Sequence, residues 1–184
     1  MRIIAGTLKG RRLAAGTWPG LRPTSDRVRE TLFNIVAPRV VGARVLDGYA
    51  GSGANGLEAL SRGAQHVTFL ERDGRACRLI ASNVERCGVQ EACAIIRADV
   101  EHLAPSTLRR ESFDLVLLDP PYAASNLHAI LEVTAPYLAK EGLLVLEHAY
   151  RRPATEVTSV LVRARQVRSG DTALAFYERR DCRA

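Results

Sequence analysis

Short aliphatic runs alternate with amphipathic segments over most of the chain, from Val40 onward. Several of these runs are rich enough in Val, Ile, Leu and Phe to be strands that are covered on both faces. The runs occupy residues 40–47, 66–71, 93–99, 113–119 and 142–149. Helical segments between them predict right-handed β-α-β crossovers. The chain is therefore expected to form an α/β fold, a doubly wound and mostly parallel sheet with helices on both faces.

The ends of the intervening helices can be predicted from capping residues. Asp73 is placed to cap a helix that runs toward Arg86, and Gly88 is placed to end it. Residues 125–142 predict a further helix closed by Gly142, although Pro136 lies inside the pattern.

The last stretch, ARQVRSGDTALAFYERR, breaks the β-α alternation. It contains two extended runs on either side of Ser169-Gly170-Asp171, which predicts an antiparallel hairpin. A dinucleotide-binding sheet usually continues with parallel strands, so this ending favours a different member of the α/β class.

Residues 1–39 are expected to form a basic N-terminal extension, with a short hairpin in IIAGTLKGRRLAAG and a helix from about Asp26 to Val36. Thr24 or Ser25 is placed to cap that helix. Its apolar stripe leaves Arg27 and Arg29 on the solvent side. The cationic residues of this segment include Lys9, Arg11, Arg12, Arg22, Arg27 and Arg29. Residues 40–184 are then the main domain.

The charge balance favours a nucleic-acid partner. The 184 residues carry a formal net charge of +6, and all cationic residues except Lys9 and Lys140 are arginine. Arginine presents a planar fork that suits phosphate and stacks on bases. The alternative is that these arginines only form a solvated surface. No apolar run approaches the roughly 20 residues that span a bilayer, and no signal peptide begins the chain, so we expect a cytoplasmic protein without a membrane partner.

Neither the four cysteines nor the four histidines have the spacing of metal ligands. We expect free thiols and no metal site. Glu147 and His148 lie near the end of the last aliphatic run of the sheet, and we expect them to have a structural role.

The loop after the first run reads GSGANG, a literal G-x-G-x-x-G, and Glu71 follows Gly51 by 20 residues. That pattern is typical of a dinucleotide-binding turn. However, Asp47 ends the strand before the loop, where a carboxylate would repel a pyrophosphate and attract a cation. The third glycine, Gly56, is expected to serve helix packing. A turn without any ligand is the alternative.

Asp119-Pro120-Pro121-Tyr122 ends the fourth aliphatic run. In a doubly wound sheet this end faces the same crevice as the glycine loop. Two prolines restrict the backbone, so the Asp119 carboxylate and the Pro120 carbonyl can accept both hydrogens of one exocyclic amine. Tyr122 offers a face on which a base can stack. The string therefore predicts a socket for an amino-bearing heterocycle.

These strings together resemble the RsmD family, bacterial 16S ribosomal RNA guanine-N2 methyltransferases. The resemblance extends from Arg2 to about Arg179. It is carried by RIIAGTLKGRRL, RPTSDRVRETLFNI, AGSGANGLEALSRGA, LLDPPY and GDTALAFYERR. It implies a seven-stranded sheet with a C-terminal antiparallel hairpin, S-adenosylmethionine as cofactor, and a guanine of 16S rRNA as substrate. We expect that RNA within a 30S subunit or assembly intermediate, bound by a monomer.

The resemblance also implies roles for individual residues. The cofactor would be held by Asp47, Gly51, Gly53, Glu71, Asp99 and Val100. The flipped guanine would be held by Asp119, Pro120 and Tyr122. Substrate contacts would come from Arg11, Arg12, Thr24, Arg27 and Pro121. One position departs from the pattern: the family loop usually reads D-L-F-A-G-S-G, whereas this chain has Gly48 and Tyr49 after Asp47.

Two other functions stay open. DPPY also suits a DNA adenine-N6 methyltransferase, although such enzymes generally need additional sequence to read a duplex. A non-catalytic RNA-binding assembly factor could retain the same fold. A nicotinamide enzyme is disfavoured, because no hydride-transfer partner such as Tyr-x-x-x-Lys accompanies the glycine loop.

Overall fold

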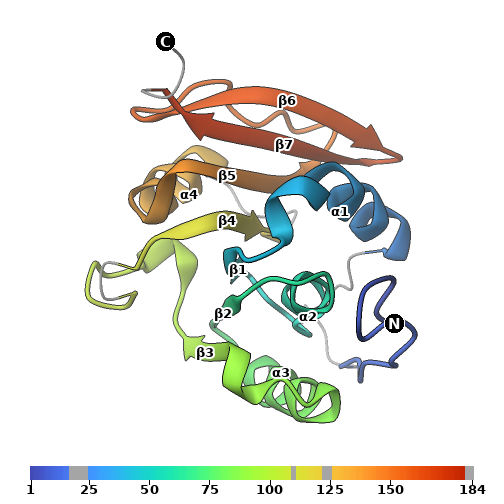
Figure 1. Ribbon diagram of the computed structural model, residues 1–184. Coiled ribbons are helices and arrows are strands. Elements are labelled where there is room, and N and C mark those ends of the chain that lie inside the picture. The colour runs from blue at the N-terminus through green and yellow to red at the C-terminus, as the bar shows by residue number, and fades with distance from the viewer. Residues whose placement is uncertain (17–24, 109–110, 122–125, 181–184) are drawn as a thin grey trace.

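The computed structural model describes residues 1–16, 25–108, 111–121 and 126–180 (Figure 1). A seven-stranded sheet runs through its centre in the order β3-β2-β1-β4-β5-β7-β6. The strands are β1 (Arg44–Gly48), β2 (His66–Glu71), β3 (Cys93–Arg97), β4 (Phe113–Leu118), β5 (Leu138–Ala149), β6 (Leu161–Ser169) and β7 (Thr172–Arg179). Neighbouring strands from β3 to β5 are parallel, and β7 is antiparallel to both β5 and β6. The predicted sheet with a C-terminal antiparallel hairpin is thus confirmed.

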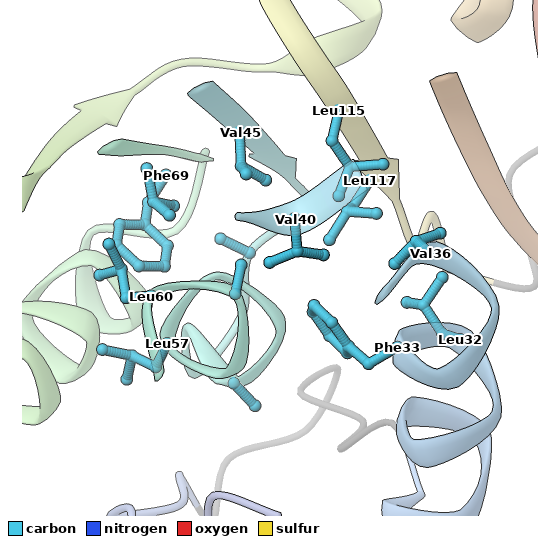
Figure 2. Packing of buried hydrophobic residues seen from close by; sticks show 14 of the residues in the cluster. Leu32, Phe33, Val36, Val40, Val45, Leu57, Leu60, Phe69, Leu115 and Leu117 are labelled. Carbon is cyan, nitrogen blue, oxygen red and sulfur yellow. The ribbon is translucent and has the colours of Figure 1, made fainter. Parts of the chain in front are cut away.

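Helices cover both faces of this sheet, and each face has its own apolar core. The helices are α1 (Asp26–Val40), α2 (Ala54–Ser61), α3 (Gly74–Cys87) and α4 (Leu127–Thr134). Side chains of α1, α2 and α3 pack on one face, together with Val45, Leu115 and Leu117 of the strands (Figure 2). On the other face α4 packs against alternate residues of the same strands, among them Leu46 and Leu118. Successive strand residues point to opposite faces, so the alternation fixes which side chains belong to which core.

The capping predictions for α1 and α3 are confirmed. Ser25 is the N-cap of α1 and its side chain accepts a hydrogen bond from the Val28 N–H. Asp73 caps α3 in the same way, by accepting from the Arg75 N–H. Gly88 ends α3 in a left-handed conformation, with φ of 67°. Thr24, the other candidate cap of α1, lies outside the described residues.

The predicted boundary between α4 and β5 was wrong. The helix ends at Thr134, a single 3-10 turn (Ala135–Tyr137) follows, and β5 begins at Leu138. Pro136 lacks the N–H that would continue the helix, which explains the early end. Gly142 does not close a helix but lies within β5, where a Cβ would come 2.8 Å from Leu138 Cδ1.

The start of the sheet was also placed too early. Helix α1 continues through Pro38 to Val40, so Val40 packs in the core as a helical residue. A turn at Gly42, with φ of 75°, then leads into β1 at Arg44.

Arg29 does not lie on the solvent side of α1 as predicted, because its side chain is fully buried. Its Nη2 donates to the Arg2 carbonyl at 2.8 Å and to Asp26 Oδ1 at 2.7 Å. Its Nε lies 3.9 Å from Oε2 of Glu58, which is equally buried. Two partners that are distant in sequence, the Glu58 carboxylate and the Arg2 carbonyl, therefore draw this arginine inward, which a helical periodicity cannot reveal.

The N-terminal hairpin is attached to the side of α2. An antiparallel bridge joins Arg2 and Arg12. The Glu58 carboxylate accepts the backbone N–H groups of Ile4 and Ala5 at 2.7 and 3.0 Å. A Cβ on Gly6 would come 1.8 Å from the Ser61 carbonyl oxygen, so only glycine permits this approach. The hairpin thus packs directly on the main domain. Among the helices of the described residues, none is long and apolar enough to span a membrane.

Candidate functional site

The carboxyl ends of the central parallel strands place three acidic residues at one edge of the sheet. Asp47 of β1 pairs with Leu117 of β4, and β4 ends one residue later. Asp119 therefore lies just beyond the end of β4, close to Asp47. Glu71 ends β2, the neighbour of β1 on its other side. The Asp119 N–H approaches the Gly48 carbonyl at 3.4 Å, which joins the ends of β4 and β1. Ligands of doubly wound sheets bind outside these strand ends.

Asp47 is the most perturbed acid of this edge. It is 2 % exposed, and its Oδ2 accepts a hydrogen bond of 2.8 Å from the Gly56 N–H in the first turn of α2. Its pKa is raised to about 8, chiefly by burial and in smaller part by the negative charges of Asp119 and Glu71, against the lowering effect of the Gly56 hydrogen bond. A neighbouring cation would lower this pKa and stabilise the ionised carboxylate, so the acidic edge favours a positively charged ligand.

The glycine loop between β1 and α2 takes three left-handed conformations. Tyr49, Gly51 and Gly53 have φ of 60°, 57° and 78°. Two of these positions carry glycine, which adopts such angles without strain. The Gly51 N–H donates to Glu71 Oε2 at 2.9 Å, so the loop is fastened to the end of β2. The Asp73 N–H donates to the other oxygen of Glu71 at 2.8 Å. Each oxygen has a second lone pair that can accept from a ligand hydroxyl.

The third glycine packs the helix on the sheet, as predicted. A Cβ on Gly56 would come 2.3 Å from Cε1 of Phe69 and 2.7 Å from Cγ1 of Val67. The close approach also brings the Gly56 N–H to Asp47. Gly56 therefore orients a site carboxylate as well as filling a packing requirement.

Asp99 and Val100 follow β3 and line the next part of the same edge. Asp99 accepts from the Glu101 N–H at 3.0 Å, and its Oδ2 lies 3.6 Å from Arg72 Nη1. Val100 is buried against the residues under the glycine loop. The Tyr49 ring packs on the same core, and burial followed by the charges of Glu101 and Asp99 raises the pKa of its hydroxyl.

Gly48 is explained by its neighbour across the strand pair. A Cβ at this position would come 2.7 Å from Cδ2 of Leu118 and 3.7 Å from Cγ2 of Val100. The Leu118 side chain thus occupies the space that a side chain on residue 48 would need. Gly48 therefore fits beside Leu118, and its carbonyl accepts from the Asp119 N–H.

The string Asp119-Pro120-Pro121-Tyr122, predicted to hold a base, is only partly described. Asp119 is half-buried, Pro120 is buried and Pro121 is exposed. Tyr122 lies outside the described residues, as does Thr24. Asp119 and Pro120 therefore lie next to the acidic edge, while the predicted stacking face of Tyr122 stays a prediction.

The predicted substrate arginines have different surroundings. Arg27 is exposed in the first turn of α1, the end of that helix nearer the carboxyl ends of the strands. Arg12 is exposed on the N-terminal hairpin. Arg11 donates through Nη1 to the Arg86 carbonyl at 2.9 Å, in the last turn of α3. That helix end lies toward the opposite edge of the sheet, so Arg11 is not part of the crevice.

Sequence reasoning missed Asn83, which joins the hairpin to the glycine loop. Asn83 is fully buried in α3. Its Oδ1 accepts the Ala14 N–H at 2.8 Å, and its Nδ2 donates to the carbonyls of Ala14 and Ser52 at 3.1 and 3.0 Å. A signal existed: Asn83 is a polar residue on the apolar stripe of α3, between Ile80 and Cys87.

A family model described as conserved hypothetical protein 95 matches residues 1–178. Ribosomal RNA small subunit methyltransferase D of Escherichia coli (strain K12) is 35 % identical over 181 residues, which cover 97 % of this chain and 90 % of that protein. The protein of the same name from Haemophilus influenzae is 44 % identical over 124 residues, or 66 % of this chain and 64 % of that protein.

Solved structures agree with this likeness over nearly the whole chain. The Escherichia coli protein yhhF, assigned as a methyltransferase, superposes with a TM-score of 0.82 at 34 % identity and covers 97 % of both chains. A hypothetical protein from Thermus thermophilus superposes with a TM-score of 0.81 at 30 % identity, over 97 % of this chain and 99 % of that one. The acidic edge and its glycine loop thus belong to a fold shared with a protein assigned as a methyltransferase.

Proposed function

The chain belongs to the RsmD family of ribosomal RNA methyltransferases, and from that premise we propose that it methylates the exocyclic N2 of a guanine in 16S ribosomal RNA, with S-adenosylmethionine as the donor. Relatives named ribosomal RNA small subunit methyltransferase D support the RNA substrate. Support for guanine N2 as the acceptor and for S-adenosylmethionine as the donor comes from the residues at the carboxyl edge of the sheet.

The observation that carries the proposal is the environment of Asp47. A buried carboxylate beside Asp119 and Glu71 is poorly suited to a pyrophosphate, which would add further negative charge. A sulfonium is a cation of moderate size that such a place stabilises. S-adenosylmethionine, when bound, supplies an activated methyl group, so the protein needs to position the acceptor and hold the donor in a fixed orientation.

The residues of the edge fit the parts of this cofactor. Asp47 with the backbone of Gly51 and Gly53 would hold the methionine portion. Glu71 would accept the ribose hydroxyls through the lone pairs that its two backbone hydrogen bonds leave available. Asp99, with Val100, would meet the adenine.

The acceptor would be held by Asp119 and Pro120. Their oxygens would accept the two N2 hydrogens of guanine, so that the nitrogen lone pair points at the methyl group. Fixed acceptors achieve this orientation without a strong base, because the proton can leave after transfer. Tyr122 would stack on the base and Pro121 would border it. A paired guanine has to leave its stack first, at a cost of a few kcal/mol.

RNA contacts outside the socket would come from residues 1–39, as an extension of the methyltransferase domain of residues 40–184. Arg27 is nearest to the strand ends and would bind phosphate beside the socket, together with Thr24. Arg11 and Arg12 would bind phosphates farther along the RNA. We propose a 30S subunit or assembly intermediate as the particle that presents the guanine, and a monomer as the form that binds it.

Labelled S-adenosylmethionine and undermethylated 30S particles test this function, with the modified base mapped by mass spectrometry. We expect one methyl group on the N2 of one guanine of 16S RNA. Asp119→Asn should abolish the transfer while leaving cofactor binding within a few-fold of the wild type. Asp114→Asn is a matched control, because Asp114 is an exposed aspartate at the other end of the same strand.

Other outcomes would support the alternatives. Label on adenine N6 of DNA would identify a DNA methyltransferase and reject the RNA assignment. Cofactor binding measured by calorimetry, with no transfer to RNA or DNA, would favour an assembly factor.

A further inference from the structure

An exposed aromatic residue follows β5 immediately, at the same edge of the sheet as the acidic site. Tyr150 is 41 % exposed and comes directly after Ala149, the last residue of β5. The β6–β7 turn reaches the same place, because Thr172 pairs with both Ala149 and Ser169 in the sheet. Tyr150 thus lies where the C-terminal hairpin meets the carboxyl edge of the parallel strands.

One face of the tyrosine is already covered by an arginine. The Arg168 guanidinium carbon lies 4.1 Å from the centroid of the Tyr150 ring. Its Nε donates to the Gly170 carbonyl at 2.8 Å, which orients the guanidinium over the ring. Arginine stacked in this way leaves N–H groups at its margin that can bind a phosphate.

The backbone beneath this pair is fixed by hydrogen bonds. The Tyr150 N–H donates to the Asp171 carbonyl at 2.8 Å, and the Arg152 N–H donates to the Ala149 carbonyl at 2.9 Å. His148 is 2 % exposed, and its Nδ1 lies 3.0 Å from the carbonyl oxygens of both Ala149 and Arg152. Both neighbours are acceptors, so Nδ1 carries the hydrogen. The buried histidine therefore holds the turn that presents Tyr150, in keeping with its predicted structural role.

The charge around the tyrosine is mostly positive. Arg151 and Arg152 follow it in the chain and Arg168 covers it, and all three are exposed. Asp171 is the acidic residue of the adjoining turn. We call Tyr150, Arg151, Arg152 and Arg168 the Tyr150 platform. An exposed aromatic ring among arginines combines the two features that bind unpaired nucleic acid, a stacking surface and a phosphate contact.

The distance to the socket matches a neighbouring nucleotide. Leu118 pairs with Leu146 in the register, so Asp119 is at the level of Glu147, three residues before Tyr150. At about 3.3 Å per residue along a strand and 4.8 Å between strands, the Asp119 and Tyr150 backbones are roughly 11 Å apart. That separation is the span of one or two nucleotides of a single strand.

We propose that the Tyr150 platform binds an unpaired nucleotide of the substrate RNA beside the target guanine, with a base stacked on Tyr150 and phosphate held by the platform arginines. The proposal rests on the proposed function for its substrate, an RNA, and adds a contact outside both the socket and residues 1–39. Such a contact would hold the strand open while the guanine is in the socket, because a base stacked on Tyr150 cannot return to its helix.

Binding of two labelled RNA probes to the full chain tests the proposal. One probe is a single-stranded 12-nucleotide oligouridylate and the other is a duplex of the same length. Tyr150→Ala should weaken binding of the single strand roughly 5- to 150-fold, the range found for loss of one base-stacking aromatic. It should leave the duplex within about twofold, because paired bases cannot stack on the ring.

Matched variants separate stacking from charge and from folding. Tyr150→Phe retains the ring and should bind as the wild type does. Arg168→Gln should reduce the salt dependence of single-strand binding by about 0.7 in log–log slope, the value for one phosphate contact. Arg44→Gln loses the same charge at the amino-terminal edge of the sheet and should leave that slope unchanged. Arg168→Gln also keeps the test valid if Tyr150→Ala fails to fold.

Equal weakening of the duplex and the single strand by Tyr150→Ala would overturn the proposal, as would no weakening of either. In both cases a wild type that still methylates 30S particles shows that only the platform is wrong. A wild type without any transfer to RNA would instead reject the proposed function.

Discussion

Replacing Asp47 by Asn tests the acidic edge through folding stability as well as through ligand binding. The pKa of Asp47 rises from 3.8 to about 8 on folding, chiefly because of burial. The folded chain thus retains a proton on this carboxyl between about pH 4 and pH 8, where the unfolded chain has lost it. The stability that this proton provides is complete below pH 4 and is lost as the pH rises to about 8. Asn cannot ionise, so the variant shows no such loss.

The size of the effect follows from the same values. One pH unit corresponds to about 1.4 kcal/mol per proton, so the full interval gives an upper limit of about 6 kcal/mol. Solvent entry and relaxation around a buried charge reduce this to roughly 2–3 kcal/mol. An Asn side chain can still accept the Gly56 hydrogen bond through Oδ1, so the variant keeps the local geometry.

Urea denaturation of both proteins from pH 5 to pH 8.5 measures the difference. We expect Asp47→Asn to be increasingly more stable than the wild type as the pH rises. Taking the difference at each pH cancels the titration of all other groups. A difference that does not change with pH, or a variant that is less stable at pH 8, would refute the account of a buried and crowded carboxyl.

The same carboxyl links cofactor binding to proton release. At pH 7 Asp47 is largely protonated, and a neighbouring sulfonium favours its ionised form. Calorimetry in buffers with different ionisation enthalpies should therefore detect release of up to about one proton when S-adenosylmethionine binds. Asp47→Asn should show no such release and weaker binding, although its fold is more stable.

Three further predictions concern packing around the site, each measured by denaturant or thermal unfolding. Gly48→Ala should cost about 1–3 kcal/mol because its Cβ would press on Leu118, and combining it with Leu118→Ala should cost less than the two changes summed. Gly56→Ala should cost about 3 kcal/mol or more, since its Cβ would overlap the ring of Phe69. Asn83→Ala should lower the free energy of unfolding by about 2–4 kcal/mol, because the buried backbone groups that Asn83 bonds lose their partners. It should also raise the KM for the cofactor, and an unchanged KM would show that Asn83 supports the fold alone.

Features that depend on neighbours in the sequence could be predicted. The strand and helix alternation follows from local apolar patterns, and the caps at Ser25, Asp73 and Gly88 each use a contact or an angle within four residues. The acidic edge could be predicted as well, because parallel strands must end at the same side of the sheet. The order of the strands and helices alone therefore predicted that Asp47 and Glu71 lie near each other.

Features that depend on partners distant in the sequence could not be predicted. Arg29 has the spacing of a solvent-facing residue, and it points inward because of the Arg2 carbonyl and the buried Glu58 across the α1–α2 contact. Glu58 in turn looks like an ordinary helix surface residue in the sequence. The helix expected up to Gly142 ended at Thr134 because Pro136 outweighed the apolar pattern that continues past it. In each case a tertiary or backbone restriction overrode a local periodicity.

Gly48 shows why a departure from a family pattern has to be judged with its neighbours. Without its neighbours, glycine in place of the family's leucine would remove a core side chain and increase the conformational freedom of the unfolded chain. Both effects would lower the stability of the turn. Leu118 on the adjacent strand reaches into that space, with its Cδ2 2.7 Å from the place of the missing Cβ. The apolar volume is thus supplied by β4 instead of β1, and the carbonyl of Gly48 stays available to the Asp119 N–H. Because Leu118 precedes Asp119 directly, the residue that fills the gap also fixes the strand end from which the socket begins. A larger residue at position 48 would therefore disturb the proposed acceptor socket before it disturbed the glycine loop.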